Sequence, residues 1–135
     1  MQAKKLTIID ANFNRAREGL RVVEDLERFF FKKNRFLKIR RLRHELSRIF
    51  ENDYEKLVKS RNVQKDEGRK LKEKPRKTLR EVFIANIFRT GEALRVLEEI
   101  LKKDEPDKAG KIKKIRFKLY TIEKEFVKDG IYEKN

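Results

Sequence analysis

One segment of this chain occurs twice, and no other feature of the sequence restricts the fold as strongly. The first copy is residues 11–26, ANFNRAREGLRVVEDL, and the second is residues 85–100, ANIFRTGEALRVLEEI. The copies lie 74 positions apart and are identical at eight of 16 positions. Two aligned pairs differ sharply, Asn14/Phe88 and Arg17/Gly91. A repeat of this kind predicts that one supersecondary unit is built twice.

The apolar residues of the first copy have the spacing of an amphipathic helix. Phe13, Ala16 and Leu20 recur at steps of three and four, and the pattern continues to about Lys32. Thr7 or Asp10 is a natural N-cap for this helix, because a short side-chain oxygen accepts from the first free backbone N–H groups. A second helix with the same apolar spacing is expected to end near residue 60.

The second half of the chain shows clearer helix boundaries. Thr78 and Glu81 form the capping box T-x-x-E, which predicts the start of the third helix. A polar break over residues 104–107 separates this helix from the fourth. Gly130 is the expected stop of the fourth helix, since glycine readily adopts the left-handed conformation that ends helices.

These helices form two similar hairpins, within residues 10–58 and 84–128, joined by a basic loop over residues 59–77. Residues 42–46 also align weakly with residues 115–119. Two hairpins with matching apolar faces bury them best against each other. The sequence therefore predicts an all-α fold with a single domain over residues 1–135. We expect an antiparallel helical bundle of two repeated helical hairpins with an approximate internal two-fold.

The composition indicates which partners to expect. Among 135 residues, 38 Lys and Arg face 23 Asp and Glu, a formal charge of +15, which favours anionic ligands. The absence of Cys excludes disulfides and Cys-based sites. Abundant Lys and Glu with few Gln and Met are typical of a thermophile. No apolar run reaches the ~20 residues of a membrane span. We expect a cytoplasmic protein that does not associate with membranes.

The polar residues of the repeat recur as regularly as the apolar ones. Five residues spaced by three form a stripe in each copy: Asn12, Arg15, Glu18, Arg21 and Glu24 in the first, and Asn86, Arg89, Glu92, Arg95 and Glu98 in the second. One interpretation is stabilising pairs along each helix, which we favour for Glu24 and Glu98. The other is a site in which the two-fold brings both stripes together, offering guanidinium groups to an anion and carboxylates to Mg²⁺.

Two further features are open to either a structural or a functional interpretation. His44 is the only histidine and lies beside the apolar face of the second helix. In the basic loop, Arg61, Asp66 and Gly68 would close over a ligand, or the loop is a solvated linker. The loop site would place Asp66 near a metal, while Gly68 would let the backbone approach a phosphate. No standard nucleotide-binding motif is present.

Residues 10–25 and 42–46, together with Ala85-Asn86 and the pattern over 89–99, resemble a known family. It is the small monofunctional hydroxymethylpyrimidine phosphate kinase family of thiamin biosynthesis, whose members occur alone or fused ahead of thiamine phosphate synthase. The resemblance implies phosphorylation of hydroxymethylpyrimidine phosphate to its diphosphate with ATP and Mg²⁺. It also implies a functional link to thiamine phosphate synthase.

The resemblance and the loop together give the expected site. The expected catalytic residues are Asp10, Glu18, His44 and Glu92. The expected substrate- and phosphate-binding residues are Asn12, Asn14, Arg15, Arg21, Arg43, Arg61, Gly68, Asn86 and Arg89. The expected Mg²⁺ ligands are Asp10, Glu18 and Asp66. Phosphoryl transfer requires mainly positioning and positive charge around the phosphates, and arginine grips phosphate with two parallel hydrogen bonds.

Two other functions compete with the kinase. The first is a non-catalytic docking or dimerisation module for thiamine phosphate synthase. The second, ranked last, is a basic nucleic-acid-binding helical protein, because glutamates lie beside the arginines that would bind phosphates. A homodimer would pair through a remaining apolar face that includes Val22 and Phe29.

Overall fold

The computed structural model describes residues 3–61 and 67–130, and these residues form helices and connecting turns without a strand. The helices are α1 (Ala3–Asp25), α2 (Phe36–Ile49), α3 (Tyr54–Lys59), α4 (Leu79–Leu101) and α5 (Pro106–Lys128), with the short turns η1 (Leu26–Phe30), η2 (Glu51–Asp53) and η4 (Glu67–Lys70). The predicted all-α helical bundle is confirmed. None of these helices combines the length and apolar character that a membrane span requires.

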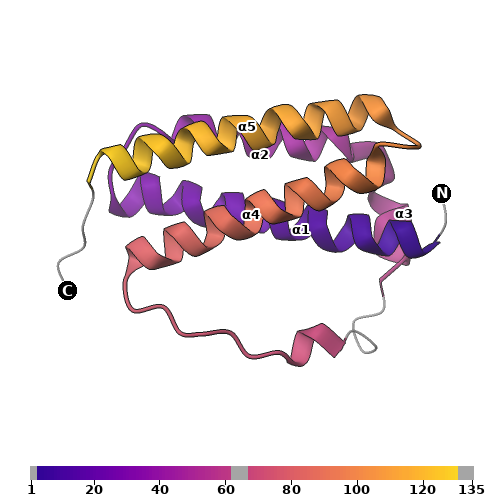
Figure 1. The fold of residues 1–135 in the computed structure, drawn as a ribbon, viewed down its shortest axis with the longest axis horizontal. Helices are drawn as coiled ribbons and strands as arrows, with labels where there is room; N and C mark the ends of the chain where they lie inside the picture. Colours follow the sequence, from indigo (N-terminus) through magenta and orange to yellow (C-terminus); the bar gives the residue numbers. More distant parts are fainter. Residues whose placement is uncertain (1–2, 62–66, 131–135) are drawn as a thin grey trace.

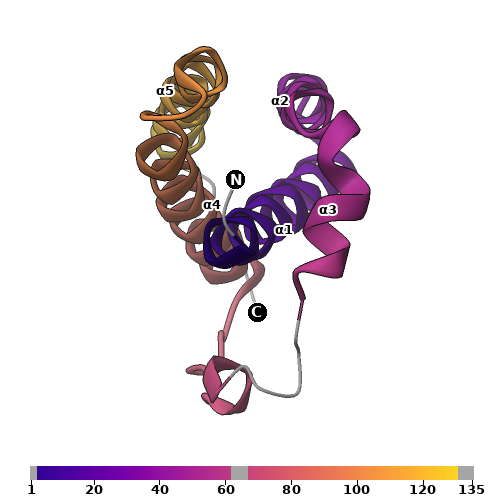
Figure 2. The same ribbon diagram turned by 90° about the vertical axis from the view of Figure 1, so that its right-hand side faces the viewer.

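The two repeated segments form the central helices of the bundle. α1 packs mainly against α4 and crosses it, while α2 folds back on α1 and α5 folds back on α4 (Figure 1). Seen end-on, α2 and α5 lie on the same side of the α1–α4 pair (Figure 2). The turn η4 and the segment that leads from it into α4 lie on the opposite side (Figure 2). The molecule is therefore two helical hairpins, α1–α2 and α4–α5, joined through their first helices.

The core consists of the apolar residues that recur at helical spacing. Leu20, Leu46, Leu94 and Leu119, one from each long helix, are fully buried. Near the start of α4 and the end of α5, at the end of the bundle where α1 turns into α2 (Figure 1), the rings of Phe83 and Phe126 stack with their centroids 3.8 Å apart. Burial of such side chains stabilises the bundle by roughly 1.5–3 kcal/mol each.

Close approach of α1 and α4 depends on a glycine. A Cβ atom added at Gly19 would lie 2.2 Å from Oγ1 of Thr90 and 3.3 Å from the backbone oxygen of Asn86. The equivalent position in α4 is Ala93, which is buried with a Cβ. The helix crossing therefore departs from two-fold symmetry. Gly19 faces Thr90 on one side, whereas the repeat copies of these two residues are Ala93 and Ala16.

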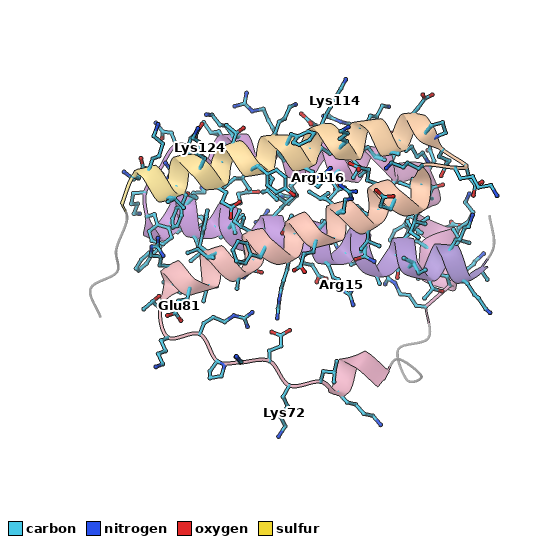
Figure 3. The ribbon with its side chains drawn as sticks, in the orientation of Figure 1. Arg15, Lys72, Glu81, Lys114, Arg116 and Lys124 are labelled. Carbon is cyan, nitrogen blue, oxygen red and sulfur yellow. The ribbon has the colours of Figure 1, made fainter. Side chains whose placement is uncertain are left out.

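Each hairpin contains a buried ion pair at equivalent positions. Nε of Arg43 donates to Oε1 of Glu24 at 2.8 Å, which joins α2 to α1. Nη2 of Arg116 donates to Oε1 of Glu98 at 3.1 Å, which joins α5 to α4. Figure 3 shows Arg116 on the bundle side of α5, whereas Lys114 points outward. Glu24 and Glu98 therefore form structural ion pairs, but their hydrogen-bonded partners lie on the neighbouring helix and not three residues away on the same helix, as we expected.

The helix boundaries agree with the sequence in the second half better than in the first. The Thr78 hydroxyl accepts from the backbone N–H of Glu81 at 3.1 Å, as the capping box predicts. Gly130 has φ 60° directly after α5, which confirms the expected stop. The predicted N-caps Thr7 and Asp10 are wrong, because α1 begins at Ala3 and both residues lie inside it.

The second predicted helix is also interrupted. α2 ends at Ile49, and the turn η2 separates it from α3, so the chain makes an elbow instead of one helix to residue 60. Lys108 at the start of α5 holds this elbow, since its Nζ lies 2.8 Å from Oδ2 of Asp53. Leu57 of α3 is buried. The change of direction brings the end of α3 onto α1, where Oγ1 of Thr7 donates to the backbone oxygen of Ser60 at 3.1 Å.

Candidate functional site

The elbow forms an open cleft of about 710 Å³ between α1, α2 and α3. Its lining residues are Thr7, Asp10, Ala11, Phe13, Asn14, Arg17, Glu18, Ser47, Phe50, Glu51, Tyr54, Leu57 and Arg61. We call this hollow the α3 cleft. Four residues expected in the site lie here, namely Asp10, Asn14, Glu18 and Arg61.

A two-point ion pair closes one side of the α3 cleft. Nε of Arg61 donates to Oδ2 of Asp10 at 2.6 Å, and Nη2 donates to Oδ1 at 3.0 Å. Asp10 is only 5% exposed, so the pair fixes a buried carboxylate at the edge of the cleft. The hydrogen bonds to Asp10 raise the pKa of Arg61 above its ordinary value. The guanidinium group of Arg61 itself stays substantially exposed and accessible to a ligand.

Hydrogen bonds extend this pair along α1. Nδ2 of Asn14 donates to the backbone oxygen of Asp10 at 3.0 Å and to its Oδ1 at 3.1 Å. Nη2 of Arg17 donates to Oδ1 of Asn14 at 3.0 Å. The α3 cleft therefore presents a connected row of cation, carboxylate, amide and cation, in the order Arg61, Asp10, Asn14 and Arg17.

Aromatic rings form another part of the cleft wall. The rings of Phe13 and Phe50 lie 4.9 Å apart at an interplanar angle of 47°. The guanidinium of Arg17 lies 5.8 Å from the ring of Phe13. Tyr54, the first residue of α3, is 66% exposed. Such surfaces bind flat rings through stacking, while the flanking arginines bind an anionic group.

The α4–α5 hairpin has a cleft at the equivalent place, but with different chemistry. This hollow of about 560 Å³, the α5 cleft, is lined by Ile87, Phe88, Gly91, Glu92, Arg95, Tyr120 and Glu123. The positions in α4 that correspond to Asp10, Asn14 and Arg17 are Ile84, Phe88 and Gly91, of which Phe88 and Gly91 line the α5 cleft. The row of polar groups therefore belongs to the α1–α2 hairpin alone. Glu92, an expected catalytic residue, lies in the α5 cleft, away from its counterpart Glu18.

Several other expected site residues have structural partners. Arg43 pairs with Glu24, and Arg21 lies 3.5 Å from Asp25 within α1. Asn12 and Asn86 have matching bonds, since each side-chain Nδ2 donates to the backbone oxygen four residues earlier, at 2.9 and 2.8 Å.

The remaining expected residues lie outside the α3 cleft. Arg15 and His44 are exposed on α1 and α2, and Gly68 is exposed in η4. Arg89 binds Glu73 of the connection between η4 and α4. Asp66 lies outside the described residues. The roles of all these residues stay predictions.

Sequence reasoning missed the aromatic residues of the α3 cleft and Arg17. A signal for Arg17 was present, because Asn14/Phe88 and Arg17/Gly91 are the two sharp differences between the repeats. Tyr54 had no such signal, since its place in the cleft depends on the elbow. Within residues 3–61 and 67–130, no group of three or more His, Asp or Glu side chains is placed to hold a metal ion.

Comparison with known proteins identifies the biosynthetic context. A family profile described as the ThiD2 family matches residues 7–125. A thiamine-phosphate synthase of Nostoc punctiforme is 39% identical over 120 residues, which cover 86% of this chain and 33% of that protein. A thiamine-phosphate synthase of Synechocystis is 40% identical over 121 residues, covering 86% of this chain and 34% of that protein. No solved structure matches.

The same name recurs in a protein of Prochlorococcus marinus (strain AS9601), which is 36% identical over 132 residues, or 95% of this chain and 37% of that protein. This chain thus spans about a third of the length of these relatives. The thiamin-biosynthesis context and the link to thiamine-phosphate synthase are confirmed. The predicted hydroxymethylpyrimidine phosphate kinase activity is wrong, because the matching relatives are named as synthases. The prediction of ATP as cofactor loses its support with the kinase.

Proposed function

Because this chain belongs to the ThiD2 family, we propose that it acts in thiamine-phosphate synthesis by binding a phosphorylated ring compound in the α3 cleft. The ligand class is thiamine phosphate or one of its phosphorylated heteroaromatic precursors. The relatives named thiamine-phosphate synthase support this class of ligand. They are about three times longer than the matched region, so the proposal concerns what this helical part contributes to that synthesis.

The observation that carries the proposal is the Asp10–Arg61 pair beside an aromatic wall. Thiamine phosphate combines a phosphate with two flat nitrogen-containing rings, one of which is cationic. Arg61 and Arg17 would bind the phosphate, since guanidinium groups bind its oxygens at two points. The exposed ring of Tyr54 would stack on a ligand ring, and a cationic ring gains further from the face of an aromatic side chain. Asp10 and Glu18 would accept hydrogen bonds from ring amino groups.

The same groups explain how the α3 cleft would discriminate between ligands. A ligand without the phosphate would leave Arg17 and Arg61 with their existing partners and gain only stacking energy. Inorganic phosphate would gain only the charge interactions. The phosphorylated ring compound alone would satisfy both parts, and its affinity should exceed that of either fragment.

Mg²⁺ stays a prediction within this proposal. The described carboxylates do not form a metal-binding cluster of their own. Mg²⁺ commonly keeps several water ligands and binds through one or two carboxylates together with phosphate oxygens. We therefore assign no step of the chemistry to a metal held by the protein alone.

Isothermal titration calorimetry with thiamine phosphate, thiamine and inorganic phosphate tests the proposal. We expect thiamine phosphate to bind most tightly, and Arg61→Gln to weaken it about ten-fold, the usual value of a hydrogen bond to a charged group. Arg95→Gln is the matched control, because Arg95 lines the α5 cleft. Unchanged affinity in Arg61→Gln, or an equal loss in Arg95→Gln, would contradict the proposal, provided that both variants melt like the wild type.

A further inference from the structure

A second group of arginines lies on the other side of the bundle, where the chain crosses from η4 to α4. We call residues 71–77 the strap. Figure 3 shows the strap running along the α1–α4 face, with Lys72 pointing away from the bundle. The Glu73 side chain instead contacts the bundle, because its Oε2 lies 2.8 Å from Nη2 of Arg89 on α4. The same oxygen accepts from Nη1 of Arg76 at 3.0 Å.

Arg89 differs from Arg21 and Arg95, two other arginines of the repeat, because its ion-pair partner lies outside its own helix. Arg21 pairs with Asp25, and Arg95 pairs with Glu99, each one turn further along its own helix. Arg89 instead binds a carboxylate from a distant part of the chain. Its copy in α1 is Arg15, which Figure 3 shows on the strap side of the bundle. The Arg15 guanidinium has only a long hydrogen bond of 3.4 Å, to Oδ1 of Asn12, within the described residues.

The Glu73 carboxylate therefore occupies a place where two guanidinium groups converge. The hydrogen bond from Arg89, followed by that from Arg76, holds the pKa of Glu73 below its ordinary value. Its side chain remains 54% exposed. Two convergent guanidinium groups in a strongly positive protein form a site that also suits phosphate oxygens. A dianionic ligand would gain more from these groups than one carboxylate does.

We propose that Arg76 and Arg89 form an anion site for a small phosphate or diphosphate, and that Glu73 occupies this site in the absence of the ligand. Arg15, the two-fold copy of Arg89, supplies a third cation on the same face. Binding of the ligand displaces the Glu73 carboxylate, and the ligand then joins Arg76 of the strap to Arg89 of α4 in its place. The site shares no residue with the α3 cleft, so this inference is independent of the function proposed above.

Pyrophosphate at constant ionic strength is the probe, measured by isothermal titration calorimetry. Removal of the internal competitor in Glu73→Gln should tighten pyrophosphate binding about three- to five-fold, the usual value of one or two surface ion pairs. Arg89→Gln should weaken binding by at least about five-fold. Glu99→Gln is the matched control. Glu99 also bridges two cations, Arg95 and Lys102, but these are close to it in sequence, so the pairs do not join the strap to α4.

The outcomes separate this site from the α3 cleft. Arg61→Gln should leave the pyrophosphate binding that responds to Glu73→Gln and Arg89→Gln unchanged, because Arg61 pairs with Asp10 in the α3 cleft. Equal or weaker binding in Glu73→Gln, wild-type binding in Arg89→Gln, or loss of binding in Arg61→Gln would each overturn the inference. Arg89→Lys serves as a second variant if Arg89→Gln does not melt cooperatively.

Discussion

The two hairpins of this protein have the same framework but different clefts. Both carry a buried Glu–Arg pair between their helices, and both carry an asparagine that donates to the preceding turn. Only the α1–α2 hairpin continues into α3, and only its cleft contains Asp10, Asn14 and Arg17. The comparison indicates that the kept pairs Glu24/Glu98 and Asn12/Asn86 maintain the fold, whereas the positions that differ sharply distinguish the chemistry of the two clefts.

The largest expected effect concerns the shared framework. Glu24→Ala and Glu98→Ala should each destabilise the protein by about 3–5 kcal/mol, because each leaves an arginine unpaired in a largely buried place. Glu98→Ala should cost more, since the side chain of Arg116 is 8% exposed and that of Arg43 is 17% exposed. Urea unfolding measures both free energies. A loss below about 1 kcal/mol in either variant, typical of an exposed pair, would show that the framework is not shared.

A smaller loss of stability is expected from a substitution at the crossing of α1 and α4, where Gly19 lies against Thr90. Gly19→Ala should destabilise by about 1–3 kcal/mol, because the new methyl group would overlap Oγ1 of Thr90. The double variant with Thr90→Ala should recover most of this loss, since the Thr90 hydroxyl has no hydrogen-bond partner within the described residues. Thermal unfolding of both single variants and the double variant gives the coupling energy. Additive effects would be inconsistent with direct contact at this crossing.

The aromatic walls of the two clefts provide the next comparison. Tyr54→Ala should weaken thiamine phosphate binding by about five-fold, a typical value for the loss of one aromatic contact. Phe88→Ala should leave the affinity unchanged, although Phe88 is similarly exposed, at 59% against 66% for Tyr54. Calorimetric titration distinguishes them. An equal loss in both variants would mean that the ligand does not select the α3 cleft.

The smallest expected effect is the pH dependence of the strap, which binds α4 through Arg89. The pKa of Glu73 is lowered in the folded protein. Because its pKa is lowered, the ionised Glu73 side chain stabilises the contact between the strap and α4 at pH values above the ordinary pKa of glutamate. This stabilisation disappears as the pH falls through the lowered pKa and the carboxylate is protonated. The contact should therefore be lost only when the pH falls below the ordinary pKa of a glutamate side chain. Carbon-13 NMR titration of the Glu73 carboxyl group measures this midpoint. In Arg89→Gln it should move upward, and an unchanged midpoint would argue against the contact.

Most of the fold could be predicted from the sequence, because it depends on local and repeated signals. Helical spacing of apolar residues, the Thr78 capping box and the Gly130 stop were all readable in the chain. The elbow was not, since the interruption after Ile49 lies in a segment whose apolar spacing continues to Leu57. Its direction depends on tertiary contacts such as that between Asp53 and Lys108.

The site could be predicted only in part for the same reason. Asp10, Asn14 and Glu18 were expected in the site from the family resemblance, and their spacing of four residues places them on one side of α1. Arg61 reaches Asp10 only because α3 turns back onto α1. The kinase prediction depended on the family resemblance alone. The matching relatives are named thiamine-phosphate synthase, which indicates thiamine-phosphate synthesis instead. The contribution of Tyr54 and Phe50 could not be read from spacing, because they meet α1 through the elbow.

The most direct test of the account exchanges the residues that distinguish the two clefts. The double variant Asn14→Phe with Arg17→Gly gives the α3 cleft two residues found at the equivalent positions of the α5 cleft. Calorimetry should show loss of thiamine phosphate binding in this variant, while Phe88→Asn in the α5 cleft keeps wild-type affinity. Retained binding in the folded double variant, or an equal loss in Phe88→Asn, would contradict the claim that the ligand site belongs to the α1–α2 hairpin.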